Sequence, residues 1–197
     1  MFSRALKKLK WSDNDVISSI FKVLYYNIFK INRFAIFEFD LSQEIPAPFL
    51  DFNKYTMKIM DYEELKKITM DKKNLPREFE MHEIDGVRYC VVIMANKDFG
   101  HISWIYLKGD KNRWFNLKED EAHVNYSFTF PGFRGAAFFP NALLECAKWL
   151  KDQKFRRIIM DVHEETIFMI KSMQKIKEVK RIGTLSQWFI FRPKFKS

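Results

Sequence analysis

Cysteine is scarce in this sequence, and its scarcity excludes several classes of protein. The 197 residues include two cysteines, Cys90 and Cys146, which stand far apart and form no CxxC pair. A disulfide-stabilised secreted scaffold and a cysteine-based zinc site are therefore excluded. Both cysteines stand in apolar stretches, so we expect free, buried thiols in a reducing compartment.

Long apolar runs and flexible linkers are lacking as well. No stretch approaches the roughly 18 to 20 apolar residues that a transmembrane helix requires. The basic start MFSRALKKLK is followed by no apolar core of the kind found in a signal peptide. Six glycines and six prolines argue against long disordered segments. We expect a cytoplasmic globular protein.

Several catalytic motifs are absent from the sequence. The four histidines and two cysteines have no metal-ligand spacing, so no metal is predicted. No Walker loop and no GxSxG elbow is present. The formal charge of +9 favours an anionic partner. Nucleic acid is disfavoured, because the aromatic residues fall on core-like faces and no RNA-binding signature occurs.

The first fifty residues differ from the rest and are predicted to form a helical extension, residues 1–50. Apolar residues from Val16 to Ile31 recur at helical spacing behind a basic segment. One interpretation is a basic amphipathic helix, within residues 1–33, that makes peripheral contact with an anionic membrane. The other is a helix that packs on its own domain or on a partner subunit, which leaves a homodimer open.

From residue 51 the pattern alternates between strands and helices and predicts an α/β domain with a mixed sheet. Asp61 and Glu64 form a capping box at the start of a helix. A second helix carries Leu143, Cys146, Ala147 and Leu150 on one face. The predicted strands are 55–60, 87–95, 101–107, 123–130 and 155–162, with a short strand at 35–41 and two closing strands in KEVKRIGTL and QWFIFRPKF.

The stretch FTFPGFRGAAFFPN, residues 128–141, has the features of a phosphate-binding turn. A strand that enters a helix through a tight turn points successive backbone N–H groups outward at the helix N-terminus. Those donors and the helix dipole favour an anion. The small residues at 135–137 allow a pyrophosphate to approach the backbone, and Arg134 adds positive charge.

Residues 55–190 resemble the GNAT superfamily of acyl-CoA-dependent N-acetyltransferases. In that family a strand ends in an apolar-x-Pro step, and an Arg-Gly-x-Gly-x-Gly turn and a helix with paired leucines follow. Here the step ends at Pro131, the turn begins at Arg134 and Gly135, and the leucines are Leu143 and Leu144. Ala137 replaces the second glycine and is tolerable with helical dihedrals, whereas the Phe139 ring must turn away from the phosphate.

The resemblance implies a GNAT-like mixed, splayed β-sheet flanked by helices, acetyl-CoA as co-substrate and an amine acceptor, such as a small molecule or a sugar amine. The residues that it assigns to the cofactor are Phe128, Thr129, Phe130, Phe133, Arg134, Gly135, Ala136, Ala137 and Phe138. Backbone N–H groups near a bulge around 128–130 are expected to polarise the thioester carbonyl.

The general base is expected at the start of one strand or the end of the next. His123 ranks first, followed by Glu121 and His163, and Asp161 is a further candidate. Alternatively, Glu121 is a solvated residue of the run KEDE and His123 a half-exposed strand residue. The tyrosine that many members use as the acid is missing, which leaves Ser172 or Tyr126 for that step. Two alternatives stay open: a non-catalytic CoA- or membrane-binding protein of the same fold, or a transferase of another acyl or aminoacyl group.

Overall fold

Seven strands form one mixed sheet in the computed structural model, which describes residues 31–188. The order of the strands is β2-β3-β4-β5-β6-β1-β7. Only β5 and β6 pair in parallel among these strands. The strands are β1 (Ile31–Asp40), β2 (Thr56–Asp61), β3 (Tyr89–Ala95), β4 (Asp98–Tyr106), β5 (Glu121–Thr129), β6 (Arg157–His163) and β7 (Val179–Trp188). The mixed α/β sheet is the predicted fold class.

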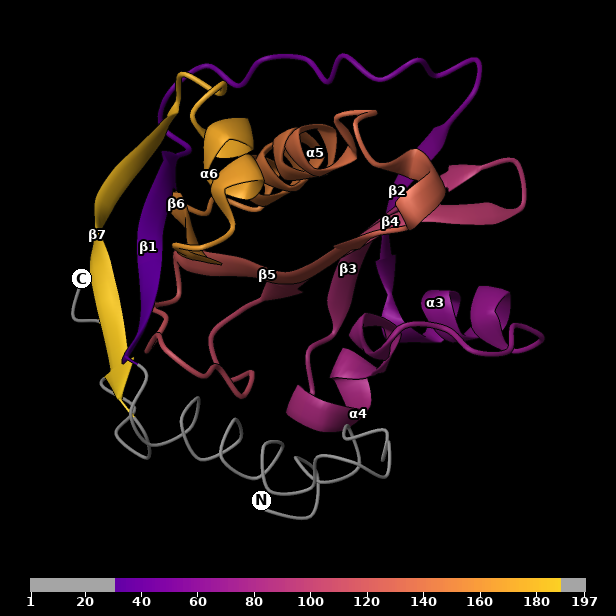
Figure 1. Cartoon of the computed structure of the whole chain (residues 1–197), viewed down its shortest axis with the longest axis horizontal. Helices are drawn as coiled ribbons and strands as arrows, with labels where there is room; N and C mark the ends of the chain where they lie inside the picture. The colour runs from indigo at the N-terminus through magenta and orange to yellow at the C-terminus, as the bar shows by residue number, and fades with distance from the viewer. Residues whose placement is uncertain (1–30, 189–197) are drawn as a thin grey trace, which may run out of the picture.

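Helices cover both faces of the sheet (Figure 1). The helices α5 (Phe138–Asp152) and α6 (Ile167–Met173) lie on one face, and α3 (Tyr62–Thr69) and α4 (Met81–Asp85) lie on the other. Two short 3-10 helices, η2 (Arg77–Glu80) and η3 (Pro131–Phe133), complete the described elements. No helix among residues 31–188 is long and apolar enough to cross a membrane.

The core follows the predicted periodicity. Leu143, Cys146, Ala147 and Leu150 of α5 are all fully buried against the sheet. Both cysteines are free and buried. Burial in apolar surroundings raises the pKa of the Cys90 thiol and that of the Cys146 thiol.

The capping box predicted at Asp61 is present. The Asp61 carboxylate accepts a hydrogen bond from the backbone N–H of Glu64, and the Glu64 side chain accepts one from the backbone N–H of Asp61. These two bonds satisfy helix donors that would otherwise be unpaired, and so they fix the start of α3 directly after β2.

The strand β1 corrects the predicted boundary at residue 50. It lies between β6 and β7 and pairs antiparallel with both, so residues 31–40 belong to the sheet. The physical reason is its two apolar faces: Ala35 and Phe37 enter the core under α5, and Ile36 enters the opposite core. The helix predicted from Val16 and the proposed membrane contact lie almost wholly outside the described residues.

The strand β7 corrects a second expectation. KEVKRIGTL and QWFIFRPKF were expected to form two separate strands, but β7 continues without a break from Val179 through Leu185 to Trp188 along β1. The rest of the second expected strand, 189–195, lies outside the described residues. A shift in register near Ile36 and Gly183 allows one strand to follow the twist of its neighbour.

Candidate active site

The turn between β5 and α5 has an unusual backbone. After η3, Gly135 has φ 91° and Ala137 has φ 56°, so both lie in the left-handed region. The expectation that Ala137 has helical dihedrals is therefore wrong, because this residue is the left-handed N-cap of α5. Successive backbone N–H groups in turns of this kind can form an anion-binding concavity.

Several N–H groups of this turn have no hydrogen-bond acceptor among the described residues. Those of Arg134 and Ala136 are used internally, by the carbonyls of Pro131 and Phe133. Within residues 31–188, four others have no acceptor: Gly135, Ala137, Phe138 and Phe139. Arg134 and Gly135 are exposed to solvent. The turn therefore presents free donors and a guanidinium at the N-terminus of a 15-residue helix.

The two phenylalanines that begin α5 point into the core. Phe138 packs edge-on against Tyr55 and stacks with Phe133, and its ring would meet a Cβ on Gly100 at 2.4 Å. Phe139 is buried, with its edge near His101. The Phe139 ring thus turns away from the outer side of the turn, as a phosphate there would require.

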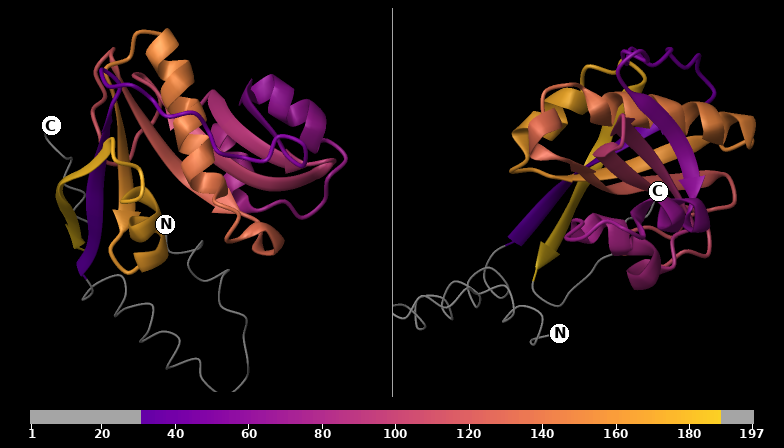
Figure 2. Two further views of the ribbon diagram at one scale, coloured as in Figure 1. Left: turned by 90° about the horizontal axis from the view of Figure 1, so that it is seen from above. Right: turned by 90° about the vertical axis from the view of Figure 1, so that its right-hand side faces the viewer.

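The strand β5 has an open edge beside this turn. It pairs with β6 at only three positions, from Glu121 to His123, and the two strands diverge beyond them (Figure 2). The Phe130 N–H is bonded to Gly100 of β4. Because N–H groups alternate along a strand, those of Ser127 and Thr129 point the other way, towards the open edge.

A β-bulge interrupts β5 at the same place. Trp104 of β4 faces Asn125, and Ile102 faces Phe128, so Tyr126 and Ser127 share one position opposite Ser103. Tyr126 has φ 48°, a strained conformation for a large residue. The bulge therefore lies at 126–127, a little before the 128–130 expected from the sequence.

His123 is buried, with both ring nitrogens engaged. The Asn112 Oδ1 accepts bonds from the N–H groups of Trp114 and Phe115, which leaves its amide nitrogen to donate to His123 Nδ1 at 2.8 Å. His123 Nε2 therefore carries the hydrogen and donates to Asp161 Oδ1 at 2.7 Å. His123 is thus fully buried rather than half-exposed.

Asp161 lies where β5 and β6 begin to diverge. Its Oδ1 also accepts a bond from Asn125 Nδ2 at 3.0 Å. Within residues 31–188, its Oδ2 has no hydrogen-bond partner. The sheet therefore brings Asp161, His123 and Asn125 together, with one carboxylate oxygen left over.

Comparison with solved structures places this architecture in a known fold. A GNAT-family acetyltransferase from Novosphingobium aromaticivorans has a TM-score of 0.51 at 9% identity, over 81% of this chain and 64% of that one. A GCN5-related N-acetyltransferase from Sphaerobacter thermophilus has a TM-score of 0.53 at 10% identity, over 91% of this chain and 58% of that one. A glucosamine N-acetyltransferase region of a fungal multi-domain β-N-acetylglucosaminidase has a TM-score of 0.56 at 11% identity, over 88% of this chain and 23% of that one.

The chain has the GNAT fold. It spans about three-fifths of the length of the first two structures. No family model matches the sequence, and no curated protein matches it significantly. The mixed sheet flanked by helices thus has the fold that the sequence predicted.

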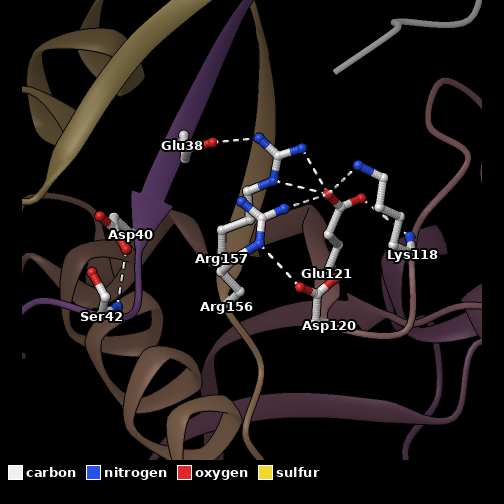
Figure 3. A network of polar contacts seen from close by, with 8 residues as sticks. All are labelled: Glu38, Asp40, Ser42, Lys118, Asp120, Glu121, Arg156 and Arg157. Atoms are coloured by element: carbon white, nitrogen blue, oxygen red, sulfur yellow. Dashed lines mark hydrogen bonds and ion pairs between the residues drawn. The ribbon is translucent and has the colours of Figure 1, made fainter.

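In this GNAT fold Glu121 lies in an ion network at the closed end of the splay (Figure 3). Its carboxylate is 1% exposed and accepts bonds from Arg157 at 2.7 and 3.1 Å and from Arg156 at 3.0 Å. Burial alone would raise the pKa of Glu121, but bonds from the Lys118 N–H and Arg157 outweigh it and lower the pKa. Glu121 is therefore buried and ion-paired, which corrects the interpretation of a solvated residue.

The remaining candidates lie apart from this group. His163 is at the end of β6, where its ring contacts Asn32, Phe34 and the Glu165 backbone N–H. Ser172 is half-buried on α6. Among the described residues no cluster of His, Cys, Asp and Glu has the arrangement of a metal site.

Sequence reasoning missed the residues that support His123 and the bulge. Asn112 stands in the charged loop GDKNRWFNLKEDE, where nothing marks it as a partner of a strand histidine. Asn125 and Ser127 lie in an alternating strand, and only the register of β4 and β5 shows that Asn125 precedes a bulge and that Ser127 belongs to it.

Proposed function

We propose that this chain transfers an acyl group, acetyl by default, from acyl-coenzyme A to an amine. The observation that carries the proposal is the position of the exposed turn at 134–137, with its free N–H groups, beside the open edge of β5. A phosphate ligand and an extended chain attached to it would occupy these two features together.

The pyrophosphate of coenzyme A would bind the N–H groups of Gly135, Ala137, Phe138 and Phe139, with Arg134 as a counter-charge. Pantetheine would then lie along β5 as an added strand, bonded to the N–H groups of Ser127 and Thr129. This places the thioester carbonyl at the bulge, where the Ser127 N–H stabilises the oxyanion that develops.

Asp161 is the base in this proposal and His123 is a positioning residue. Both nitrogens of His123 are occupied, so its part is to orient Asp161 through the bond from Nε2. The second carboxylate oxygen of Asp161 takes the proton from the attacking amine, which must be neutral to react. Asp161→Asn is expected to lower kcat about a hundredfold while acetyl-CoA affinity stays unchanged.

Calorimetric titration with acetyl-CoA tests the binding half of the proposal. Arg134→Glu is expected to weaken acetyl-CoA binding at least tenfold, because a repulsive charge replaces an attractive one next to the pyrophosphate. Lys73→Glu is the matched control, with the same change of charge in the exposed loop between α3 and η2. Failure of the wild type to bind acetyl-CoA would sink the proposal.

Thiol release from acetyl-CoA, measured over a panel of amines, tests the reaction. The panel starts with glucosamine, because a similar solved structure is named as a glucosamine N-acetyltransferase region. It continues with other amino sugars, amino acids and peptide N-termini. Acetyl-CoA binding without thiol release on any amine would instead favour a non-catalytic CoA-binding protein.

A further inference from the structure

Four side chains form a buried hydrogen-bonded chain between β4 and β5 that the proposed reaction has not used. Thr129 Oγ1 lies 2.7 Å from His101 Nδ1, and His101 Nε2 lies 2.7 Å from Ser103 Oγ. Ser103 Oγ donates to Ser127 Oγ at 2.6 Å. His101 and Ser103 are fully buried. This row of polar groups ends at Ser127, the second residue of the bulge at 126–127.

The direction of the chain follows from the Ser103–Ser127 bond, in which Ser103 Oγ is the donor. Ser103 has one hydroxyl hydrogen and gives it to Ser127, so it must accept its other bond from His101 Nε2–H. Burial lowers the pKa of His101 to about 3, so the ring is neutral and its Nδ1 accepts from the Thr129 hydroxyl. Every hydrogen of the chain then has an acceptor except that of Ser127, for which residues 31–188 offer none.

The Ser127 hydroxyl lies on the face that carries α5 and α6. Ala122 and Val124 belong to the core under α5, whereas Tyr126 and Phe128 pack into the opposite core. Ile105 of β4 also belongs to the core under α5, and Ser103, two residues before it, lies on the same face of the sheet. Ser127 bonds to Ser103 at 2.6 Å and therefore lies on the α5 side as well. Its own N–H points to the open edge, so hydroxyl and N–H both border the place proposed for the thioester.

We propose that Ser127 is a catalytic residue whose hydroxyl donates a hydrogen bond to the departing thiolate of coenzyme A. His101 and Ser103 are positioning residues: Ser103, oriented by His101, donates a hydrogen bond to Ser127 Oγ, and the hydroxyl hydrogen of Ser127 stays free. This inference rests on the proposed function. As the tetrahedral intermediate collapses, the C–S bond breaks and both of its electrons stay on sulfur. The amine proton is then on Asp161, and the products are the amide and the thiolate bonded to Ser127.

The test compares calorimetric affinities for coenzyme A and for desulfo-coenzyme A, which lacks the sulfur, at pH 8.5, where about half of a free thiol is ionised. Ser127→Ala is expected to weaken coenzyme A binding about tenfold, as for a lost bond to a charged group, and to leave desulfo-coenzyme A unchanged. Ser127→Thr keeps the hydroxyl and should restore the wild-type ratio of the two affinities. Ser103→Ala, which frees the Ser127 hydroxyl to rotate, should give a smaller loss for coenzyme A alone.

Each outcome bears on one proposal or on both. If the wild type binds neither ligand, the proposed function and the role of Ser127 both fall. If the wild type binds both and Ser127→Ala weakens them equally or not at all, the role of Ser127 is wrong and the proposed function stands. If the buried hydrogen-bonded chain had a purely structural role, Ser127→Ala would reduce the affinities for coenzyme A and desulfo-coenzyme A together and leave their ratio unchanged.

Discussion

Replacing Glu121 with glutamine tests whether its buried carboxylate stabilises the paired end of β5 and β6. The substitution keeps the shape of the side chain and removes its charge from a site that is 1% exposed. Arg157 then keeps Glu38 as its acidic partner, at 2.5 Å, and Arg156 keeps Asp120. The neutral amide cannot accept all the bonds that the carboxylate accepts from the two arginines and the Lys118 N–H.

The expected loss in the free energy of unfolding is about 3 kcal/mol. Removing one partner of a buried ion pair costs about 3 to 5 kcal/mol, because the other charge stays buried and unpaired. The lower end of this range of free energies applies here, since Glu38 still neutralises Arg157. The pKa of Glu121 is lowered in the folded state. Its contribution is therefore complete above its unfolded pKa, and is lost as the pH falls through the folded pKa.

Urea denaturation at pH 7 measures this loss, with Asp120→Asn as the matched control. Asp120 is the neighbouring acidic residue and bonds to Arg156 at 3.0 Å, but both side chains are about half exposed. Exposed pairs contribute little, so the midpoint of Asp120→Asn should match that of the wild type. Equal midpoints for Glu121→Gln and Asp120→Asn would refute the claim that the buried carboxylate holds β5 to β6.

Three further substitutions probe the turn and the buried chain. Ala137→Gly should raise the free energy of unfolding by up to about 1 kcal/mol. The substitution removes left-handed backbone strain of about 1 to 2 kcal/mol, and the greater backbone entropy that glycine loses on folding offsets only part of this gain. A destabilised variant would argue against the left-handed cap. Gly100→Ala should cost about 1 to 3 kcal/mol and weaken acetyl-CoA binding, because the new Cβ displaces Phe138 at the start of α5; unchanged urea and binding curves would contradict that contact. Burial lowers the pKa of His101 from its ordinary 6.5 to about 3, so stability should fall by roughly 1 kcal/mol per pH unit below pH 6.5, where only the unfolded ring takes up a proton. His101→Asn should lack this component in urea titrations from pH 7 to 4, and an identical pH dependence would exclude a buried neutral ring.

Local pattern was sufficient to predict most of the elements and the turn. The face of α5 and the capping box of α3 depend on spacings of three and four residues, which the sequence shows directly. The turn at 134–137 combines small residues, a charge and a following helix within one short segment. Such features need no knowledge of which strands are neighbours.

Non-local pairing accounts for what the sequence could not show. The insertion of β1 between β6 and β7 depends on partners more than a hundred residues away. The run KEDE is typical of a solvated loop, and Glu121 is buried only because β6 brings Arg157 beside it. The chain from Thr129 to Ser127 likewise requires the register of β4 and β5.

Residue-resolved hydrogen exchange in the presence of acetyl-CoA tests the central claim most directly, because it reports where the cofactor lies. The amides of Gly135, Ala137, Phe138 and Phe139 in the turn, and of Ser127 and Thr129 at the strand edge, should exchange more slowly when the ligand is bound. The amides of Phe130 and Arg134, which are already bonded within the protein, should change little. Protection confined to other regions, or none at all, would contradict a cofactor site formed by this turn and the open edge of β5.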